Sequence, residues 1–172
     1  LAHVLNLPFQ KTYTDAAAPI NPALIYLPKA AFIAVTVLMM AGMSNAVNIT
    51  DGMDGLAGGI SAAVALGLCI LALVSGTQAW AQYLLVPYVQ GSEELAVIAG
   101  AIAGACLGFL WWNCSPAQVC MGDTGSLCLG GLIGYIAVII RQEVVILLMC
   151  GVFLMEIASV VMQVGYFKIS GG

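Results

Sequence analysis

The sequence has very little charge. Only 7% of its 172 residues are Asp, Glu, Lys or Arg, whereas 62% are hydrophobic, and the net charge is −4. Soluble globular domains carry roughly a quarter charged residues, so this composition excludes that class. The four basic residues are scattered along the chain at Lys11, Lys29, Arg141 and Lys168. Nucleic acid is excluded as a partner because phosphate binding requires clustered Lys and Arg.

The sequence also lacks the side-chain groupings that usually bind zinc or build a nucleophilic site. None of the six cysteines stand in a Cys-x-x-Cys spacing, and the single histidine is His3. We therefore expect no disulfide framework, no zinc site and no Ser/His/Asp or Cys/His constellation.

Long apolar runs are abundant, and the mean hydropathy is +1.07. The runs cover residues 24–43, 56–74, 95–112, 127–140 and 144–167. A helix needs about twenty residues to cross a hydrocarbon core, and the fourth run would reach only about 21 Å, so it should borrow residues from the preceding loop. Continuous runs favour helices over strands. The predicted fold is an all-α integral membrane bundle of about five transmembrane helices in one domain.

Two of the polar loops must share a membrane face. Residues 44–55 and 113–126 are separated by two crossings, whereas residues 75–94 lie on the opposite side. Of the eight acidic residues, Asp51, Asp54 and Asp123 fall in the two loops that share a face. These three carboxylates are therefore predicted to lie at one end of the bundle.

The first of these loops contains "NAVNITDGMDGLAGG", residues 45–59. Asp51 and Asp54 are three residues apart and are expected on one helical face at the start of the second span. Helix capping is one explanation, because Asp is a favoured N-cap and a second acid three residues later imitates a capping box. Capping accounts less well for Asn45 and Asn48, or for the glycines that permit close approach to the backbone. A functional site is the interpretation we favour.

The other loop reads "NCSPAQVCMGDTGSLCLGG", residues 113–131, and leads directly into an apolar helix. Backbone N–H groups at a helix start attract anions. Asp123 would repel a phosphate there unless a cation lay between them, so the co-facing carboxylates indicate Mg²⁺ shared with a phosphorylated ligand. An N-cap Asp followed by turn glycines is the alternative.

Two further patterns lie within the spans. Glu156, Ser159 and Gln163 form a polar stripe that is expected to face the bundle interior, either as an internally bonded group or as part of an ion pathway. A transporter is therefore one alternative function, and a non-catalytic membrane subunit is another. The repeat of Gly100, Gly104 and Gly108 is typical of helix packing, and glycine-rich faces would permit a homodimer.

Both loop motifs and the closing stretch "VVMQVGYFKISGG" resemble those of the polyprenyl-phosphate N-acetylhexosamine-1-phosphate transferases. Thr50 before Asp51 and the string "PAQV…MGDTGSL" resemble the branch that acts on muramoyl-pentapeptide more than the N-acetylglucosamine-1-phosphate branch. The resemblance implies a Mg²⁺-dependent enzyme of the bacterial inner membrane. It would transfer phospho-N-acetylmuramoyl-pentapeptide from its UDP carrier (UDP-MurNAc-pentapeptide) to undecaprenyl phosphate, forming lipid I and UMP in peptidoglycan synthesis.

The resemblance also implies roles for individual residues. Asp123 would be the Mg²⁺ ligand, and Asp51, Asp54 and Asp123 would be the catalytic acids. The residues expected to bind the uridine-diphosphate substrate are Asn48, Gly52, Met53, Asp54 and Asn113. The active-site loops would face the cytoplasm, although a count of the four basic residues favours the opposite side.

The match departs from the family pattern in two respects. Cys120 stands where the family usually has an aromatic residue, expected to stack on uracil. The family's upstream Asp-Asp pair and histidine-rich loop are not in this sequence, and the family has about ten spans. We therefore expect the 172 residues to be a segment of a longer transferase.

Overall fold

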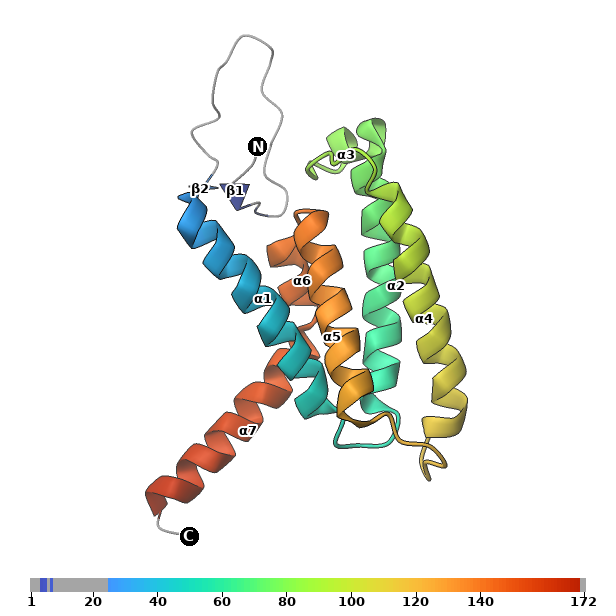
Figure 1. Ribbon diagram of the computed structural model, residues 1–172, viewed down its shortest axis with the longest axis vertical. Helices are drawn as coiled ribbons and strands as arrows, with labels where there is room; N and C mark the ends of the chain where they lie inside the picture. Colours follow the sequence, from blue (N-terminus) through green and yellow to red (C-terminus); the bar gives the residue numbers. More distant parts are fainter. Residues whose placement is uncertain (1–3, 6, 8–24, 171–172) are drawn as a thin grey trace.

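The computed structural model describes residues 4–5, 7 and 25–170 of the chain. The elements are β1 (Val4–Leu5), β2 (Ile25–Tyr26), α1 (Lys29–Thr50), α2 (Leu56–Gly76), α3 (Gln78–Tyr83), α4 (Glu93–Asn113), α5 (Gly122–Ile139), α6 (Glu143–Met149) and α7 (Gly151–Ser170). Five described helices, α1, α2, α4, α5 and α7, are long and apolar enough to cross a membrane. The two short strands pair with each other in antiparallel fashion, outside those helices. The prediction of an all-α membrane bundle is confirmed (Figure 1).

Small residues bring the helices of the bundle together in two pairs. Helices α2 and α4 pack through buried alanines, among them Ala65 and Ala99. Helix α1 crosses α5 at Gly130 and Gly134, and a Cβ atom on Gly130 would overlap the carbonyl oxygen of Met43. Lipid tails are as apolar as side chains, so such helices associate through close van der Waals packing rather than through the hydrophobic effect.

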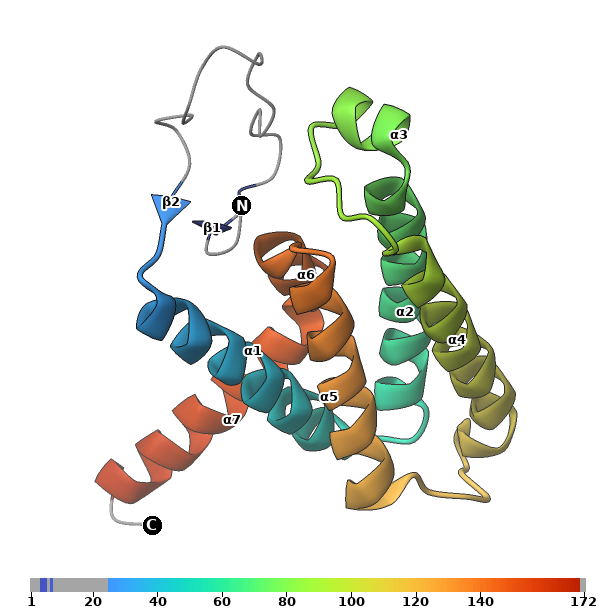
Figure 2. The same ribbon diagram turned by 45° about the horizontal axis from the view of Figure 1, so that its top comes forward.

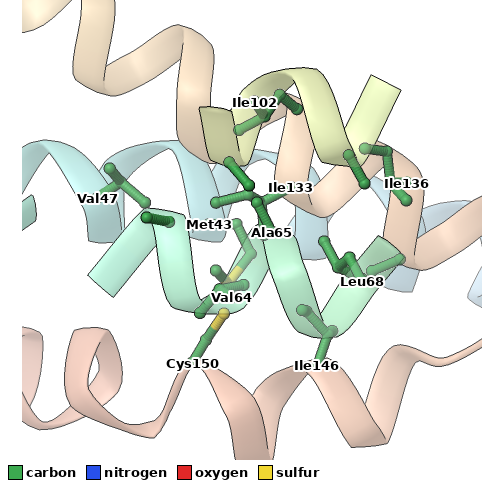
Figure 3. Close-up of a cluster of buried hydrophobic side chains, with 14 of the residues drawn as sticks. Met43, Val47, Val64, Ala65, Leu68, Ile102, Ile133, Ile136, Ile146 and Cys150 are labelled. Carbon is green, nitrogen blue, oxygen red and sulfur yellow. The ribbon is translucent and has the colours of Figure 1, made fainter. Parts of the chain in front are cut away.

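Further buried side chains fill the space between the helices. Figure 3 labels the buried side chains Met43, Val47, Val64, Ala65, Leu68, Ile102, Ile133, Ile136, Ile146 and Cys150. They come from α1, α2, α4, α5 and α6 and from the junction before α7. This shared core fixes the four long helices that carry the polar loops relative to one another.

The first span extends further toward the polar loop than predicted. Its predicted start at Leu24 lies outside the described residues, and α1 continues to Thr50 rather than ending at residue 43. Within this extension, two polar side chains bond to carbonyl groups one turn back. Asn45 Nδ2 donates to the Ala41 oxygen at 2.8 Å, and Thr50 Oγ1 donates to the Ala46 oxygen at 2.9 Å.

The middle spans agree closely with the sequence prediction. Helix α2 covers residues 56–76 against the predicted 56–74, and α4 covers residues 93–113 against the predicted 95–112. The short fourth run, predicted over 127–140, does borrow residues from the loop before it, since α5 begins at Gly122.

The prediction of one continuous last span over 144–167 is wrong. The chain breaks at Cys150 into α6 and α7, and the residue after the break is Gly151. Glycine weakens a helix interior and commonly stands where a helix changes direction. Helix α7 departs from the bundle in both views (Figures 1 and 2), and Phe153 is its only buried residue among those described.

Candidate functional site

The two polar loops predicted to share a face are joined by hydrogen bonds. The backbone N–H of Gly55 donates to Asn113 Oδ1 at 3.0 Å, and that of Ala117 donates to Asp54 Oδ2 at 3.1 Å. The α1–α2 and α4–α5 connections lie at the same end of the bundle, opposite α3 (Figure 2). The prediction from the number of crossings is therefore confirmed.

The expectation that Asp51 and Asp54 share a helical face is wrong. Helix α1 ends at Thr50 with Asp51 as its C-cap, and α2 begins only at Leu56. Between them the chain turns through Gly55, whose φ of +77° is one that residues with a Cβ rarely adopt. The two carboxylates are therefore presented by a turn rather than by a helix.

Helix capping does not account for the three carboxylates. The N-cap of α2 is Gly55 and that of α5 is Met121, and neither helix has a side-chain capping bond. Asp51 instead lies at the C-terminus of α1, where the helix dipole disfavours negative charge. This placement costs stability rather than adding to it, which favours the functional interpretation over capping.

Asn48, in the last turn of α1, connects the two acidic loops. Its Nδ2 donates to Asp123 Oδ1 at 3.1 Å and to Ser126 Oγ at 3.0 Å. One turn earlier, Ser44 Oγ donates to the backbone oxygen of Leu127 at 2.9 Å. The close crossing at Gly130 lets α1 come near enough to α5 for both links to form.

The electrostatics of the site favour a cation. Burial raises the pKa of Asp51, and the neighbouring Asp123 carboxylate raises it further. Among the described residues, the ion pair found is between Arg141 and Glu143, next to α6, and no basic side chain pairs with these acids. Negative charge at this end is thus not compensated within the described part of the chain, and a bound cation would relieve it.

Asp51 and Asp123 are compatible with a magnesium ion that is shared with a ligand. No group of three or more Asp, Glu, His or Cys side chains that could hold a metal is found among the described residues. Mg²⁺ is commonly held by only one or two carboxylates, with water and substrate phosphates as its other ligands. The exposed Asp123 and the neighbouring half-buried Asp51 fit that pattern.

The remaining predicted binding residues are placed in different ways. Gly52 and Met53 are exposed in the turn, Met53 at 69%. Asn113 is only 5% exposed, and its side chain is engaged within the loops, accepting from Gly55 and donating to the Val119 oxygen at 2.9 Å. Its contact with a nucleoside stays a prediction. In the structure, the Asn113 side chain holds the two loops together. Cys120 is exposed on the same connection.

The two patterns noted within the spans contribute little to this site. Gln163 is exposed and donates to Ser159 Oγ at 3.1 Å, whereas Glu156 and Ser159 are half-buried. The stripe therefore does not face the bundle interior as expected, because α7 departs from the bundle. Gly104 and Gly108 have no atom of the described chain within 4 Å of a Cβ built on them.

The sequence motifs predict no individual role for Ser44 or Ser126. Both serines connect α1 and α5 beside Asn48. Their spacing offered a signal, because Ser44 lies four residues before Asn48 and Ser126 lies three residues after Asp123. Residues at such spacings share a helical face.

Comparison with known proteins gives a family match over most of the chain. Residues 2–141 match the model of glycosyl transferase family 4. The chain is 48% identical to the phospho-N-acetylmuramoyl-pentapeptide-transferase of Thermodesulfovibrio yellowstonii over 98% of its own length and 44% of that protein. The protein of the same name from Desulfotalea psychrophila is also 48% identical to the chain, over 98% of the chain and 44% of that protein.

A third relative matches a shorter part of the chain at higher identity. The phospho-N-acetylmuramoyl-pentapeptide-transferase of Neisseria gonorrhoeae is 53% identical over 80% of this chain and 38% of that protein. The chain thus spans less than half the length of the curated relatives it matches.

Proposed function

The chain belongs to glycosyl transferase family 4, and on that basis we propose that it forms part of the active site of a phospho-N-acetylmuramoyl-pentapeptide transferase. The donor is UDP-MurNAc-pentapeptide, the acceptor is undecaprenyl phosphate, and the products are lipid I and UMP. The relatives that bear this transferase name cover 98% of the chain, which supports the assignment.

The observation that carries the proposal is the junction of the two acidic loops. Asn48 bonds to Asp123, the Ala117 N–H bonds to Asp54, and Asp123 raises the pKa of Asp51. Three carboxylates from two distant stretches of sequence thus lie at one end of a membrane bundle, without basic partners among the described residues. Such an arrangement suits a metal that is shared with a diphosphate.

The residues present suit phosphoryl transfer. An oxygen of the lipid phosphate attacks the phosphorus that bears the sugar, and the bond from that phosphorus to the bridging oxygen of the UMP leaving group breaks. A bound Mg²⁺ would neutralise charge on the diphosphate. The free backbone N–H groups in the first turn of α5 would orient the donor phosphates, and Asp123 and Asp51 would hold the metal.

An apolar groove beside the site supports a lipid acceptor. It has a volume of about 460 Å³ and is lined by Gly59, Ile60, Ala63, Val64, Met149 and Val152. Gly59 lies one helical turn from Gly55, so the groove begins close to the polar turn and follows α2 into the apolar part of the bundle. A prenyl chain in this groove would bring its phosphate toward the polar loops.

The test uses the full-length transferase in detergent with Mg²⁺, undecaprenyl phosphate and UDP-MurNAc-pentapeptide. We expect Asp123→Ala to lower the rate of lipid I formation by about 100-fold or more, because preorganised charge stabilisation of a transition state is worth that much. The matched control is Glu94→Ala, which removes an exposed carboxylate from the first turn of α4 at the opposite end. The control should retain the wild-type rate, and an Asp123→Ala enzyme that also retains it contradicts the proposal.

A further inference from the structure

Ser126 is fully buried in the first turns of α5, and its hydroxyl group is bonded on both sides. The hydroxyl donates to the Gly122 carbonyl oxygen at 3.1 Å, with the Asp123 carbonyl oxygen at 3.3 Å as the alternative acceptor. A hydroxyl has one proton, so its remaining lone pairs can only accept. They receive the Asn48 amide at 3.0 Å.

This arrangement leaves the Asn48 amide a single favourable orientation. The amide has two N–H donors, and one points to Ser126 Oγ while the other points to Asp123 Oδ1. If the amide were turned over, its carbonyl oxygen would face a carboxylate and a hydroxyl whose proton is already engaged. Ser126 and the carboxylate together therefore select the orientation of Asn48 that donates to Asp123.

The consequence falls on the carboxylate of Asp123. Its side chain is exposed, so little packing restricts its rotation. A bond from Asn48 to Oδ1 holds the group, and no hydrogen bond to Oδ2 is found among the described residues. Mg²⁺ requires near-octahedral geometry at short distances, so an oriented carboxylate binds it better than a freely rotating one.

We propose that Ser126 is a positioning residue that acts through Asn48 to orient the Asp123 carboxylate for the metal. The inference rests on the proposed function, because it takes Asp123 as a metal ligand. Removing a residue that hydrogen-bonds to a metal ligand commonly lowers metal affinity or activity by about 10- to 100-fold.

The test measures Mn²⁺ binding by electron paramagnetic resonance on the purified full-length protein in the presence of UMP. We expect Ser126→Ala to raise the dissociation constant for Mn²⁺ about tenfold, as removal of an outer-shell partner does elsewhere. The Ser126→Thr variant keeps the hydroxyl and should restore most of the affinity. Ser44→Ala is the matched control, because the Ser44 hydroxyl also bonds α1 to α5 but makes no described hydrogen bond to Asn48 or Asp123.

A double-substitution cycle separates positioning from general destabilisation. If Ser126 acts through Asn48, the Ser126→Ala change should have no further effect on Mn²⁺ affinity in an Asn48→Ala background. Additive effects overturn the inference, and so does a Ser44→Ala variant that loses as much affinity as Ser126→Ala. If Ser126→Ala binds Mn²⁺ with wild-type affinity while Asp123→Ala loses binding, the inference about Ser126 is overturned and the proposed metal role of Asp123 stands. Undiminished binding in Asp123→Ala, or none in the wild type, overturns the proposed metal role together with it.

Discussion

At the scale of single residues, Asp51 occupies an unfavourable position for a charge. It lies at the negative end of the α1 dipole, half-buried and beside Asp123. Burial first, and Asp123 second, raise its pKa above the ordinary value of 3.8. The site therefore holds a carboxylate whose charged form is disfavoured when no cation is bound.

The raised pKa of Asp51 determines how the stability of the fold changes with pH. Well below the ordinary Asp pKa the group is protonated in both the folded and the unfolded state, so the penalty is absent. The penalty appears as the pH rises from 3.8 through the raised pKa of the folded state and is complete above it. We expect Asp51→Asn to raise the melting temperature of the metal-free protein at pH 7 and to leave it unchanged near pH 3.

Thermal unfolding of the full-length protein in detergent checks this prediction. Saturating Mg²⁺ should raise the melting temperature of the wild type more than that of Asp51→Asn, because the cation offsets the same repulsion that the substitution removes. If Asp51→Asn raised the melting temperature equally at pH 7 and near pH 3, its effect could not come from the charge of Asp51.

At the scale of helices, the crossing of α1 over α5 sets the distance between the acidic loops. Gly130 makes the crossing possible, since a Cβ there would overlap the Met43 carbonyl oxygen and lie 2.7 Å from the Cα of Ser44. Both obstacles are backbone atoms, which cannot rotate away. The links from Ser44 and Asn48 to α5 depend on this approach.

The Gly130→Ala substitution should force the two helices apart. Overpacking of this kind typically costs about 1 to 3 kcal/mol of folding free energy. We expect a lower melting temperature and weaker metal binding, because the contact from Asn48 to Asp123 lengthens. The matched control is Gly131→Ala, since a Cβ at Gly131 meets nothing within 4 Å. If the two variants behave alike, the close crossing does not determine the site.

At the scale of the whole molecule, the two ends of the bundle carry different elements. One end carries the acidic loops, and the other carries α3 and the short strand pair (Figure 1). The family resemblance predicts that the acidic end faces the cytoplasm. Cys120 is exposed at the acidic end, and Gln90 is exposed on the connection after α3.

Thiol labelling of intact cells tests this orientation. In a full-length protein whose other cysteines are replaced by alanine, a membrane-impermeant maleimide should not label Cys120 until the cells are opened. A variant that instead carries Gln90→Cys as its only cysteine should be labelled in intact cells. The reverse pattern contradicts the proposed cytoplasmic orientation.

Much of this architecture could be predicted from sequence because the bilayer imposes a simple rule. Backbone polar groups must be satisfied within each spanning segment, so long apolar runs become helices. That rule predicted α2 and α4 to within two residues at each end, and the number of crossings predicted which loops meet. The rule says nothing about polar residues at helix ends, so it misplaced the end of α1, and it did not reveal the break at Cys150.

The sequence by itself determined the membrane class, the helical fold, the shared face of the two acidic loops and the motifs that indicate a transferase. Each of these depends on composition or on order along the chain. Only the tertiary structure decided that Asp51 and Asp54 lie on a turn, that Asn48 joins Asp123 to Ser126, and that α7 departs from the bundle. These features depend on how closely two helices approach, and that distance is set by atoms such as the Met43 carbonyl opposite Gly130, which lie far apart in the sequence.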